Sequence, residues 1–521
     1  MEKQKYILSK LVMAMDGLIA LFMIGAISSS LFAVSQMFPE PLIDTKFYFT
    51  SGFMVLVGII TAFRLVCLKS SSFHLLPLLE MAAWGVCTVL ALCYICQKIG
   101  ILSLYSTYGA GSFDNIAGLS SCLSLSLPLG LSWAKYMESK EVQYRMLLFC
   151  LSKLLCVIAI ILCQSRTGML CVAVWLFLSF MPTHKRKWTF VLVPTLLVVS
   201  IFFKSDSSKG RWFIVQRTME LIAQRPLFGW GKDGFMAHYM DVQAEYFARF
   251  PHDPNGMLAD NVHHPLNEYL AAMVDFGSVG LFLILAFFVF TFWYGYHHQS
   301  RYSILGMKVL ILLGLFSLFS YPFQYPFTWF MLAFSLLGIY LPFWESRPKV
   351  LSFCLLGVAL WGGCRLQSSW RDNMELAKMQ KKSRLGLSKL NLAKYVAMYP
   401  RMEYDSRFLF YYASDLYLVG YNAQAVQKAM ECKRLLADYQ LNLLIGDIYR
   451  AMGWKDSTLT YYGRAHNMCP SRFAPLYEMY NTCKELGDTT TCLKLRKEIL
   501  SKPIKVYGQE TKDMIREVKS F

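Results

Sequence analysis

Residues 146–182 have the sequence MLLFCLSKLLCVIAIILCQSRTGMLCVAVWLFLSFMP, in which the polar segment Gln164 to Gly168 separates two apolar runs. The first run approaches the roughly 20 residues with which an α-helix crosses the hydrocarbon core of a bilayer, and the second is somewhat shorter. We therefore expect two membrane helices joined by a tight turn. Because the rest of the first 364 residues has the same character, this stretch predicts the fold class, an all-α polytopic membrane helix bundle.

The overall composition agrees with this class. Hydrophobic residues make up 55% of the 521 residues, and the mean hydropathy of +0.37 is too high for a water-soluble enzyme of this length. A window of about 20 residues predicts about eleven or twelve spans. The first begins after several lysines but has no small-residue cleavage site, so we expect a retained helix and not a signal peptide. The predicted spans lie near 7–32, 47–67, 74–96, 115–134, 146–164, 167–182, 188–203, 266–296, 303–321, 326–344 and 349–364.

The distribution of basic residues predicts the orientation in the membrane. With a cytoplasmic N-terminus, the short inner segments hold fifteen Lys and Arg and the short outer ones hold three. Since basic loops stay in the cytoplasm, an odd number of spans places the polar loop 204–263 and the C-terminal domain outside the cytoplasm. The inner residues are Lys3, Lys5, Lys10, Arg64, Lys69, Lys135, Lys140, Arg145, Lys185, Arg186, Lys187, Arg301, Lys308, Arg347 and Lys349, and the outer ones are Lys46, Lys98 and Arg166.

A second domain follows the membrane domain of residues 1–364. Residues 372–521 are polar and contain no apolar segment of about 18 residues. Three glycines, Gly420, Gly453 and Gly487, are spaced 33 and 34 residues apart. This period predicts a small helical-repeat domain of the tetratricopeptide kind. Such a domain is either a helical cap that stabilises the chain or a groove for a peptide or a partner protein.

Charge and cysteine content exclude other classes of site. The net charge of +18 follows mainly from the inner loops, so we expect no nucleic-acid partner. None of the fifteen cysteines has zinc-ligand spacing, and the loop has no carboxylate cluster. We therefore expect neither a metal nor a cofactor. Four cysteines lie in the C-terminal domain, and the sequence leaves their pairing open: Cys432, Cys469, Cys483 and Cys492.

Arg166 is the first candidate site residue. An arginine at membrane depth is costly unless it is paired or lines a wet cavity, so it indicates a functional site; the alternative is a structural arginine that reaches the interface. The Ser, Thr and Gly beside it predict a hydrogen-bonded turn that aims the guanidinium.

The loop 204–263 supplies further candidates. Apolar residues at helical spacing over 212–223 predict an amphipathic helix that lies along the membrane and has Arg211 at its start. Arg217 is a weaker candidate for binding phosphate. The glycines of residues 229–234 resemble a phosphate cradle only superficially, because no strand precedes them, and a tight turn is the better interpretation.

The segment that follows the loop carries two histidines. In a helix opened by Pro265, the side chains of His264, Asn267 and Glu268 share one face. A neutral imidazole there takes a proton from a hydroxyl group, and Asn267 or Glu268 fixes its tautomer. Capping and anchoring at the interface are the alternative role of this segment.

Three groups of residues between about 115 and 345 form one combined pattern. They are Ser165 to Gly168; Arg211-Trp212 with Leu221-Ile222, Pro226-Leu227 and the Gly229, Gly231, Gly234-Phe235 turn; and Asn267 to Leu270 leading into Phe276 to Leu281. Together they resemble the O-antigen ligase and O-antigen polymerase superfamily. That family has a histidine directly before the asparagine, where this chain has Leu266. Either His264 substitutes for it or the base lies elsewhere.

The resemblance implies a GT-C-like bundle in the bacterial inner membrane that takes glycan from undecaprenyl diphosphate on the periplasmic face, without a metal. The loop 204–263 and the C-terminal domain would then lie in the periplasm. The acceptor is lipid A core, another glycan or a protein hydroxyl, as in a ligase, a polymerase or a protein O-glycosylating enzyme. Arg166 and Arg211 would hold the diphosphate and His264 would be the general base. Arg217, Asn267 and Glu268 would contact the substrate.

Two other classes of function remain as alternatives. A transporter or flippase of lipid-linked glycans would use the same arginines without catalysis, and the ionisable residues Asp16 and Lys153 within spans favour it. Against it, the membrane half has no internal repeat. A membrane-tethered scaffold for the repeat domain would need only a single span.

Overall fold

The computed structural model of the chain describes residues 2–67, 75–102, 110–130, 142–180, 205–505 and 507–520. Over these ranges the regular structure is helical, without a strand, which confirms the predicted all-α class. Contacts divide the chain into two compact units. Unit 1 comprises residues 1–203 and 284–377, and unit 2 comprises residues 204–283 and 378–521.

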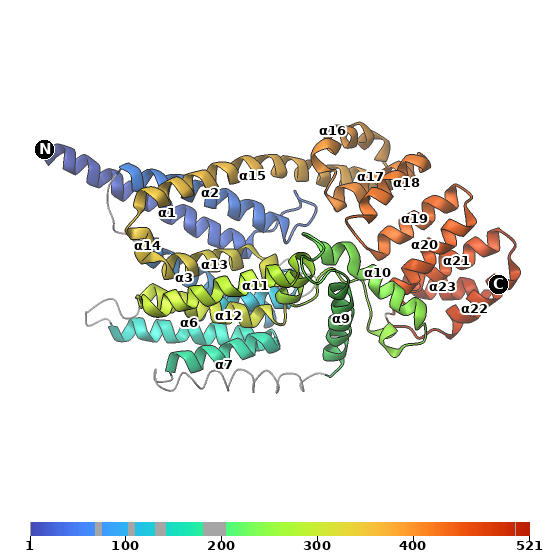
Figure 1. The fold of residues 1–521 in the computed structure, drawn as a ribbon, viewed down its shortest axis with the longest axis horizontal. Coiled ribbons are helices and arrows are strands. Elements are labelled where there is room, and N and C mark those ends of the chain that lie inside the picture. Colours follow the sequence, from blue (N-terminus) through green and yellow to red (C-terminus); the bar gives the residue numbers. More distant parts are fainter. Residues whose placement is uncertain are drawn as a thin grey trace. The chain divides into compact units, whose positions relative to one another are not determined.

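Unit 1 is the membrane bundle. Its most enclosed helix is α4 (Ile116–Ser126), in which every residue from Gly118 to Ser126 is buried. Helix α1 packs along α2, and α12 packs along α13. Figure 1 labels α1, α2, α12 and α13. Besides α4, the described elements of unit 1 are α1 (Glu2–Phe32), α2 (Asp44–Cys67), α3 (Leu75–Lys98), α6 (Val142–Leu162), α7 (Arg166–Phe180), α12 (Arg301–Ser317), η3 (Pro322–Gln324), α13 (Pro326–Ile339), α14 (Leu341–Glu345), and parts of α11 (Glu268–His297) and α15 (Pro348–Arg384).

Six of the described helices are long and apolar enough to cross a membrane: α1, α2, α3, α6, α11 and α15. Helices α4, α7 and α13 are apolar but shorter. The expected span at 115–134 differs, because its helix ends at Ser126. The expected span at 188–203 lies outside the described residues.

The helix that contains the last expected span, 349–364, extends well beyond it. Helix α15 continues to Arg384. Residues 365–384 contain neither proline nor glycine and are rich in good helix formers. Hydropathy falls at Arg365 because the side chains become polar, and that change does not interrupt backbone hydrogen bonding.

Ionisable residues inside unit 1 have protein partners. The Arg64 Nη2 donates a hydrogen bond to Asp16 at 3.1 Å, and the Lys153 Nζ donates to the carbonyl oxygen of Ser126 at 3.1 Å. Charges in a membrane are costly unless paired in this way. Asp16 and Lys153 therefore both have partners within the bundle, and the transporter stays an alternative.

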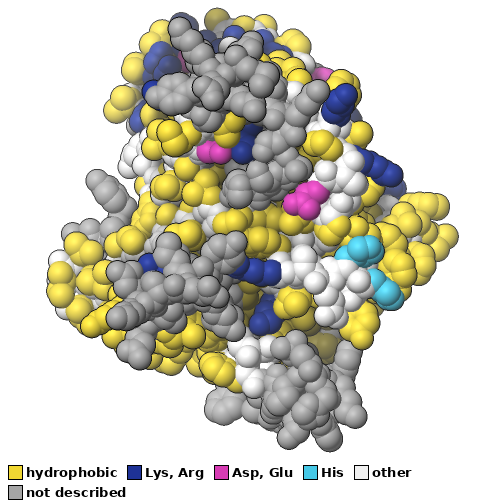
Figure 2. All heavy atoms as spheres, turned by 90° about the vertical axis from the view of Figure 1, so that its left-hand side faces the viewer, with side chains coloured by type: hydrophobic (Ala, Val, Ile, Leu, Met, Phe, Trp, Pro, Cys, Tyr) yellow, Lys and Arg dark blue, Asp and Glu magenta, His cyan; other side chains and the backbone are white. Residues whose placement is uncertain are grey.

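One face of the bundle is mainly apolar. Figure 2 shows hydrophobic side chains over much of this face, with Lys and Arg among them and few acidic side chains. Helix α11 also carries exposed apolar side chains, since Phe282, Val289 and Phe290 are all more than half exposed. Large exposed apolar side chains on a long helix suit contact with lipid.

Unit 2 combines the polar loop with the C-terminal helices. The loop forms α9 (Ser205–Gln224), α10 (Gly234–Arg249) and η2 (Pro254–Met257), after which α11 begins. The C-terminal elements form successive helices, of which α17 packs on α18, α19 on α20 and α21 on α22 (Figure 1). They are η4 (Ser388–Asn391), α16 (Leu392–Met402), α17 (Ser406–Val419), α18 (Asn422–Lys433), α19 (Tyr439–Ala451), α20 (Lys455–Met468), α21 (Ala474–Glu485), α22 (Thr489–Ser501) and α23 (Gln509–Ser520).

The three periodic glycines occupy equivalent turns. Gly420, Gly453 and Gly487 have φ values of 93°, 76° and 70° and lie between the two helices of each packed pair. A left-handed backbone at a helix end favours glycine. The 33- to 34-residue period therefore marks the places where the chain reverses. The tetratricopeptide identity of these pairs stays a prediction.

Candidate functional site

Arg166 is the first residue of α7, in unit 1. The Ser165 hydroxyl caps this helix by accepting a hydrogen bond from the Gly168 backbone N–H at 3.1 Å, and Gln164 turns the chain with a φ of 51°. A Cβ at Gly168 would clash with the hydroxyl of Ser120 in α4. The first turn of α7 is thus pressed against α4, and the expected turn holds the half-buried Arg166 at the helix N-terminus.

A polar cluster that the sequence did not reveal lies at the N-terminus of α4. The Tyr325 hydroxyl donates to Asp114 at 2.7 Å, and the Asn115 amide donates to the hydroxyls of Tyr321 at 3.0 Å and Tyr325 at 2.9 Å. Asn115 also caps α4 through the Gly118 backbone N–H. Only this capping has a local signal, an asparagine before an apolar helix. The tyrosines are more than 200 residues away.

Arg211 lies on an exposed part of α9, in unit 2. This helix begins at Ser205, so the prediction that Arg211 starts it is wrong. The helix is amphipathic as expected, with Phe213 and Leu221 buried and Trp212 exposed. Its position along the membrane stays a prediction.

Arg217 has a more enclosed environment on the same helix. Its guanidinium stacks on the ring of Tyr246 at 3.9 Å and pairs with Glu220 at 3.0 Å, and only 11% of the side chain is exposed. Stacking and pairing of this kind stabilise the packing of α9 on α10. A role of Arg217 in binding phosphate stays a prediction.

The glycine-containing turn 229–234 binds the start of α11. The backbone N–H of Trp230 donates to the Val274 carbonyl at 2.8 Å, and that of Gly231 donates to the Asp275 carbonyl at 2.9 Å. The Asp275 carboxylate accepts from the backbone N–H of Gly234 at 3.0 Å, at the N-terminus of α10. These amides are committed to protein acceptors, so the tight-turn interpretation is confirmed over the phosphate cradle.

Helix α11 is kinked where this turn meets it. Gly277 has φ 68° and ψ −170°, values that are not helical, and a Cβ there would clash with the Leu227 carbonyl. The Ser278 backbone N–H donates to the Pro226 carbonyl at 2.8 Å. The two motifs Pro226 to Phe235 and Phe276 to Leu281, which are separate in sequence, thus form one structural contact.

The helix expected at Pro265 begins three residues later. Helix α11 starts at Glu268, and Asn267 caps it by accepting from the backbone N–H groups of Tyr269 at 2.9 Å and Leu270 at 3.0 Å. Leu266 has a φ of 55°, which is incompatible with a helix. The prediction that His264, Asn267 and Glu268 share a helical face is therefore wrong. Asparagine is a strong N-cap, and this preference outweighed that of proline for a first turn.

The histidine segment contacts the repeat domain. The Asn261 amide donates to the Asp438 carboxylate at 2.6 Å, and the Nε2 of His263 lies 3.5 Å from the same carboxylate oxygen. His264, the next residue, is exposed. Sequence reasoning missed Asp438, because no local pattern connects two groups that lie 177 residues apart.

The loop and the repeat domain share one hydrophobic core. Leu221, Phe235 and Tyr239 of the loop pack with Ala465 and Met468 of α20. The Gln243 amide donates to the Met468 carbonyl at 2.6 Å, and Arg464 pairs with Asp241 at 2.7 Å. Buried apolar contact with satisfied polar groups is typical of a stable domain core. The repeat domain is therefore the folding partner of the loop.

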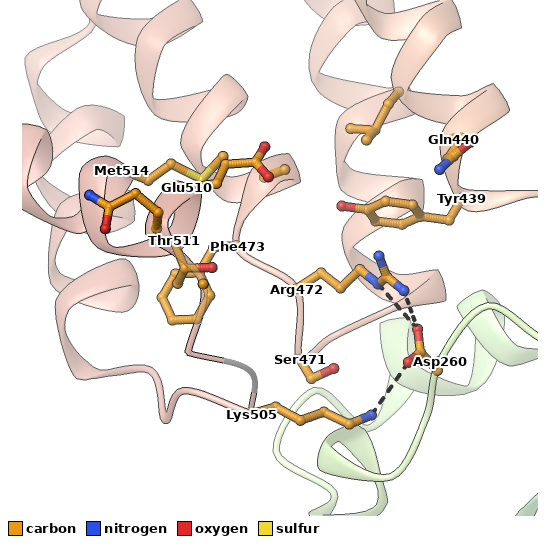
Figure 3. Close-up of a pocket in the computed structure, with 14 residues that line it drawn as sticks. Asp260, Tyr439, Gln440, Ser471, Arg472, Phe473, Lys505, Glu510, Thr511 and Met514 are labelled. Atoms are coloured by element: carbon orange, nitrogen blue, oxygen red, sulfur yellow. Dashed lines mark hydrogen bonds and ion pairs between the residues drawn. The ribbon is translucent and has the colours of Figure 1, made fainter. Parts of the chain in front are cut away.

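Asp260 joins the loop to the repeat domain at one side of a pocket of about 680 Å³. Figure 3 shows its carboxylate held by Arg472 at 2.7 Å and Lys505 at 3.7 Å. Burial acts to raise the pKa of Asp260, but hydrogen bonds from Arg472 and from the Asn261 backbone outweigh it, so the pKa lies below its usual value. Tyr439 and Phe473 also line this pocket.

The candidates therefore fall in both units. Arg166 belongs to unit 1, whereas the other candidates belong to unit 2. Among the described residues, no group of three or more His, Cys, Asp or Glu side chains is arranged to hold a metal ion. The candidates in unit 2 are Arg211, Arg217, His264, Asn267 and Glu268.

Comparison with known proteins places these residues within one family pattern. Residues 151–285 match the family model described as O-Antigen ligase. The matched range includes all six candidates, from Arg166 to Glu268. None of the curated proteins matches the chain. The match supports the resemblance to the O-antigen ligase superfamily and, in general terms, a function of the ligase or polymerase kind.

Proposed function

We propose that the chain is a glycosyltransferase of the bacterial inner membrane, which transfers glycan from undecaprenyl diphosphate to an acceptor hydroxyl on the periplasmic face. The family match over residues 151–285 carries this proposal, because it spans the candidate arginines and histidines together. The membrane helices support it, since a polyprenyl donor resides in the bilayer.

Arg166 and Arg211 each bind the donor diphosphate in this proposal. As the bond between the anomeric carbon and the phosphate oxygen breaks, negative charge grows on the leaving lipid diphosphate. A guanidinium matches the phosphate oxygens with paired N–H groups and stabilises that charge. The exposed position of Arg211 on α9 and the helix N-terminal position of Arg166 on α7 suit this role.

A histidine of the loop takes the proton from the acceptor hydroxyl as its oxygen bonds to the anomeric carbon. His264 is the candidate from sequence. The argument that separated it from His263 assumed a helix from Pro265, and that helix begins at Glu268. Both histidines therefore enter the test. Asn267, which caps α11, and Glu268 contribute by holding the end of the segment in place.

The acceptor is lipid A core, another glycan or a protein hydroxyl, corresponding to a ligase, a polymerase or a protein O-glycosylating enzyme. We assign recruitment of the acceptor or of an assembly partner to the repeat domain. The pocket beside Asp260 supports this assignment, since about 680 Å³ is within the size range of ligand pockets.

Transfer with purified protein tests the proposal. The protein, in nanodiscs, is incubated with undecaprenyl-diphosphate glycan and each acceptor class, and released undecaprenyl diphosphate is measured together with the glycosylated acceptor. Release that depends on an acceptor is expected, and the product identifies the acceptor class. Movement of the intact donor across a liposome membrane without release would instead indicate the flippase.

A further inference from the structure

Asp438 is a buried carboxylate that links the repeat domain to the histidine segment. It is the N-cap of α19, and its Oδ1 accepts hydrogen bonds from the backbone N–H groups of Gln440 at 2.6 Å and Leu441 at 3.0 Å. A carboxylate at a helix N-terminus is stabilised by these N–H groups and by the helix dipole. Capping alone uses only one of the two carboxylate oxygens.

The second oxygen of Asp438 faces the loop. Its Oδ2 accepts from the Asn261 amide at 2.6 Å and lies 3.5 Å from the Nε2 of His263. The Asn261 side chain also accepts from the backbone N–H of Tyr439 at 3.4 Å. The carboxylate thus holds a helix with one oxygen and the histidine segment with the other.

Both sides of this contact are held by further bonds. The backbone N–H of Ala437, directly before Asp438, donates to the Met236 carbonyl of α10 at 2.9 Å. The Val262 backbone, between Asn261 and His263, is in contact with the Met240 sulfur at 3.3 Å. Such support fixes the approach of the imidazole to the carboxylate.

The geometry points to Asp438 as a positioning residue for glycan transfer, which orients His263 as the general base; this inference rests on the proposed function. The His263 Nε2 also lies 3.3 Å from the Asn261 side-chain nitrogen, and the imidazole tautomer decides which of its two neighbours it bonds. In the tautomer with Nε2–H directed at the carboxylate, the lone pair lies on Nδ1. That nitrogen takes the acceptor proton, and the carboxylate stabilises the imidazolium that forms. Of the two adjacent histidines, His263 is the one beside the buried carboxylate.

Asp438→Asn tests the inference, because asparagine is as good an N-cap as aspartate but lacks the negative oxygen. We expect kcat of the transfer reaction to fall about ten- to a hundredfold, with the KM for the donor unchanged. The matched control is Asp405→Asn. Asp405 caps α17 by accepting from the Phe408 backbone N–H at 3.0 Å and should retain full activity as asparagine. Equal melting temperatures of the two variants exclude unfolding.

A double-mutant cycle separates orientation from general support. His263→Ala should lower kcat by about a hundredfold or more, His264→Ala should be much milder, and Asp438→Asn should add nothing in the His263→Ala background. If Asp438→Asn behaves like Asp405→Asn, or lowers kcat by the same factor with and without His263, the inference is wrong. Failure of the proposed function has a different signature, since the wild-type protein itself would then release no lipid diphosphate.

Discussion

The three arginines proposed from sequence have different surroundings. Arg217 is enclosed by the Tyr246 ring and Glu220, with 11% of its side chain exposed. Arg211 is exposed, and Arg166 is half-buried at a helix N-terminus. A residue that grips a ligand must reach it, so exposure favours Arg211 and Arg166 over Arg217 as phosphate ligands.

Replacing Arg166 or Arg211 by lysine should lower the rate of transfer at least about tenfold, equivalent to about 1.4 kcal/mol. Lysine keeps the charge but lacks the planar fork that binds two phosphate oxygens. The measurement is kcat/KM for the undecaprenyl-diphosphate donor. Arg249→Lys is the control, because Arg249 belongs to the same loop and is not a candidate site residue. Its side chain is 74% exposed and lies 4.0 Å from Glu245. If both variants transferred glycan at the wild-type rate, the two arginines would serve only to set the membrane topology.

Among the elements, the glycine turn contacts α11 through its backbone, near the kink of that helix. The turn supplies backbone N–H groups to Val274 and Asp275, and the kink at Gly277 allows Leu227 to approach. The strict dependence on glycine here comes from backbone contact, which leaves no space for a Cβ. The motif is therefore structural even though it lies within the family pattern.

Gly277→Ala should destabilise the protein by about 1–3 kcal/mol, since the backbone conformation at this position is accessible essentially only to glycine. The melting temperature in nanodiscs measures the effect. Gly357→Ala in α15 is the matched control: apart from its own helix, none of the described residues comes within 4 Å of the added Cβ, and alanine favours a helix there. Equal melting temperatures for the two variants would show that the kink is not required.

The contact of Asp260 with the repeat domain should depend on pH. Because the pKa of Asp260 is lowered in the folded protein, its contribution to stability is present above about pH 4, the unfolded value. It is lost as the pH falls through the lower folded pKa. Asp260→Asn should therefore lower the melting temperature at pH 7 and have a diminishing effect as the pH falls below about 4.

The control for this experiment is Asp513→Asn. Asp513 pairs with the nearby Arg516 and Gln509 on the surface of α23, and exposed pairs of this kind contribute little. A melting temperature of Asp260→Asn equal to that of the wild type at neutral pH would show that the contact adds nothing measurable.

For the whole molecule, the shared core of unit 2 constrains the topology. Leu221 and Phe235 pack with Ala465 and Met468, so the loop and the repeat domain must lie on the same side of the membrane. The count of basic residues predicts that this side is the periplasm. The two arguments are independent of each other.

Reporter fusions after Gly256 and after Gly453 should both give a periplasmic signal. An alkaline phosphatase fusion active at both sites, together with an inactive fusion after Arg347, would agree with the predicted orientation. Opposite locations for Gly256 and Gly453 would be incompatible with the common core of unit 2. A cytoplasmic location for both would reverse the orientation and move the proposed site with it.

Local properties of the chain were enough to predict the membrane class, the turn before Arg166 and the periodic glycines. Apolar length, a serine cap and a glycine at a helix end each act over a few residues, so they are visible in sequence. Hydropathy does not show how far α15 extends, because a helix continues through polar residues that are good helix formers.

Three features are visible only in the tertiary structure. They are the union of the loop with the repeat domain, the start of α11 at Glu268 and the pairing of His263 with Asp438. Each depends on groups that compete for the same partners or lie far apart along the chain. Asn261 and Asp438 meet across 177 residues, and Leu266 takes a left-handed φ in the segment that these contacts hold. Hydrogen bonds between residues so far apart along the chain are fixed by packing and leave no periodicity in the sequence.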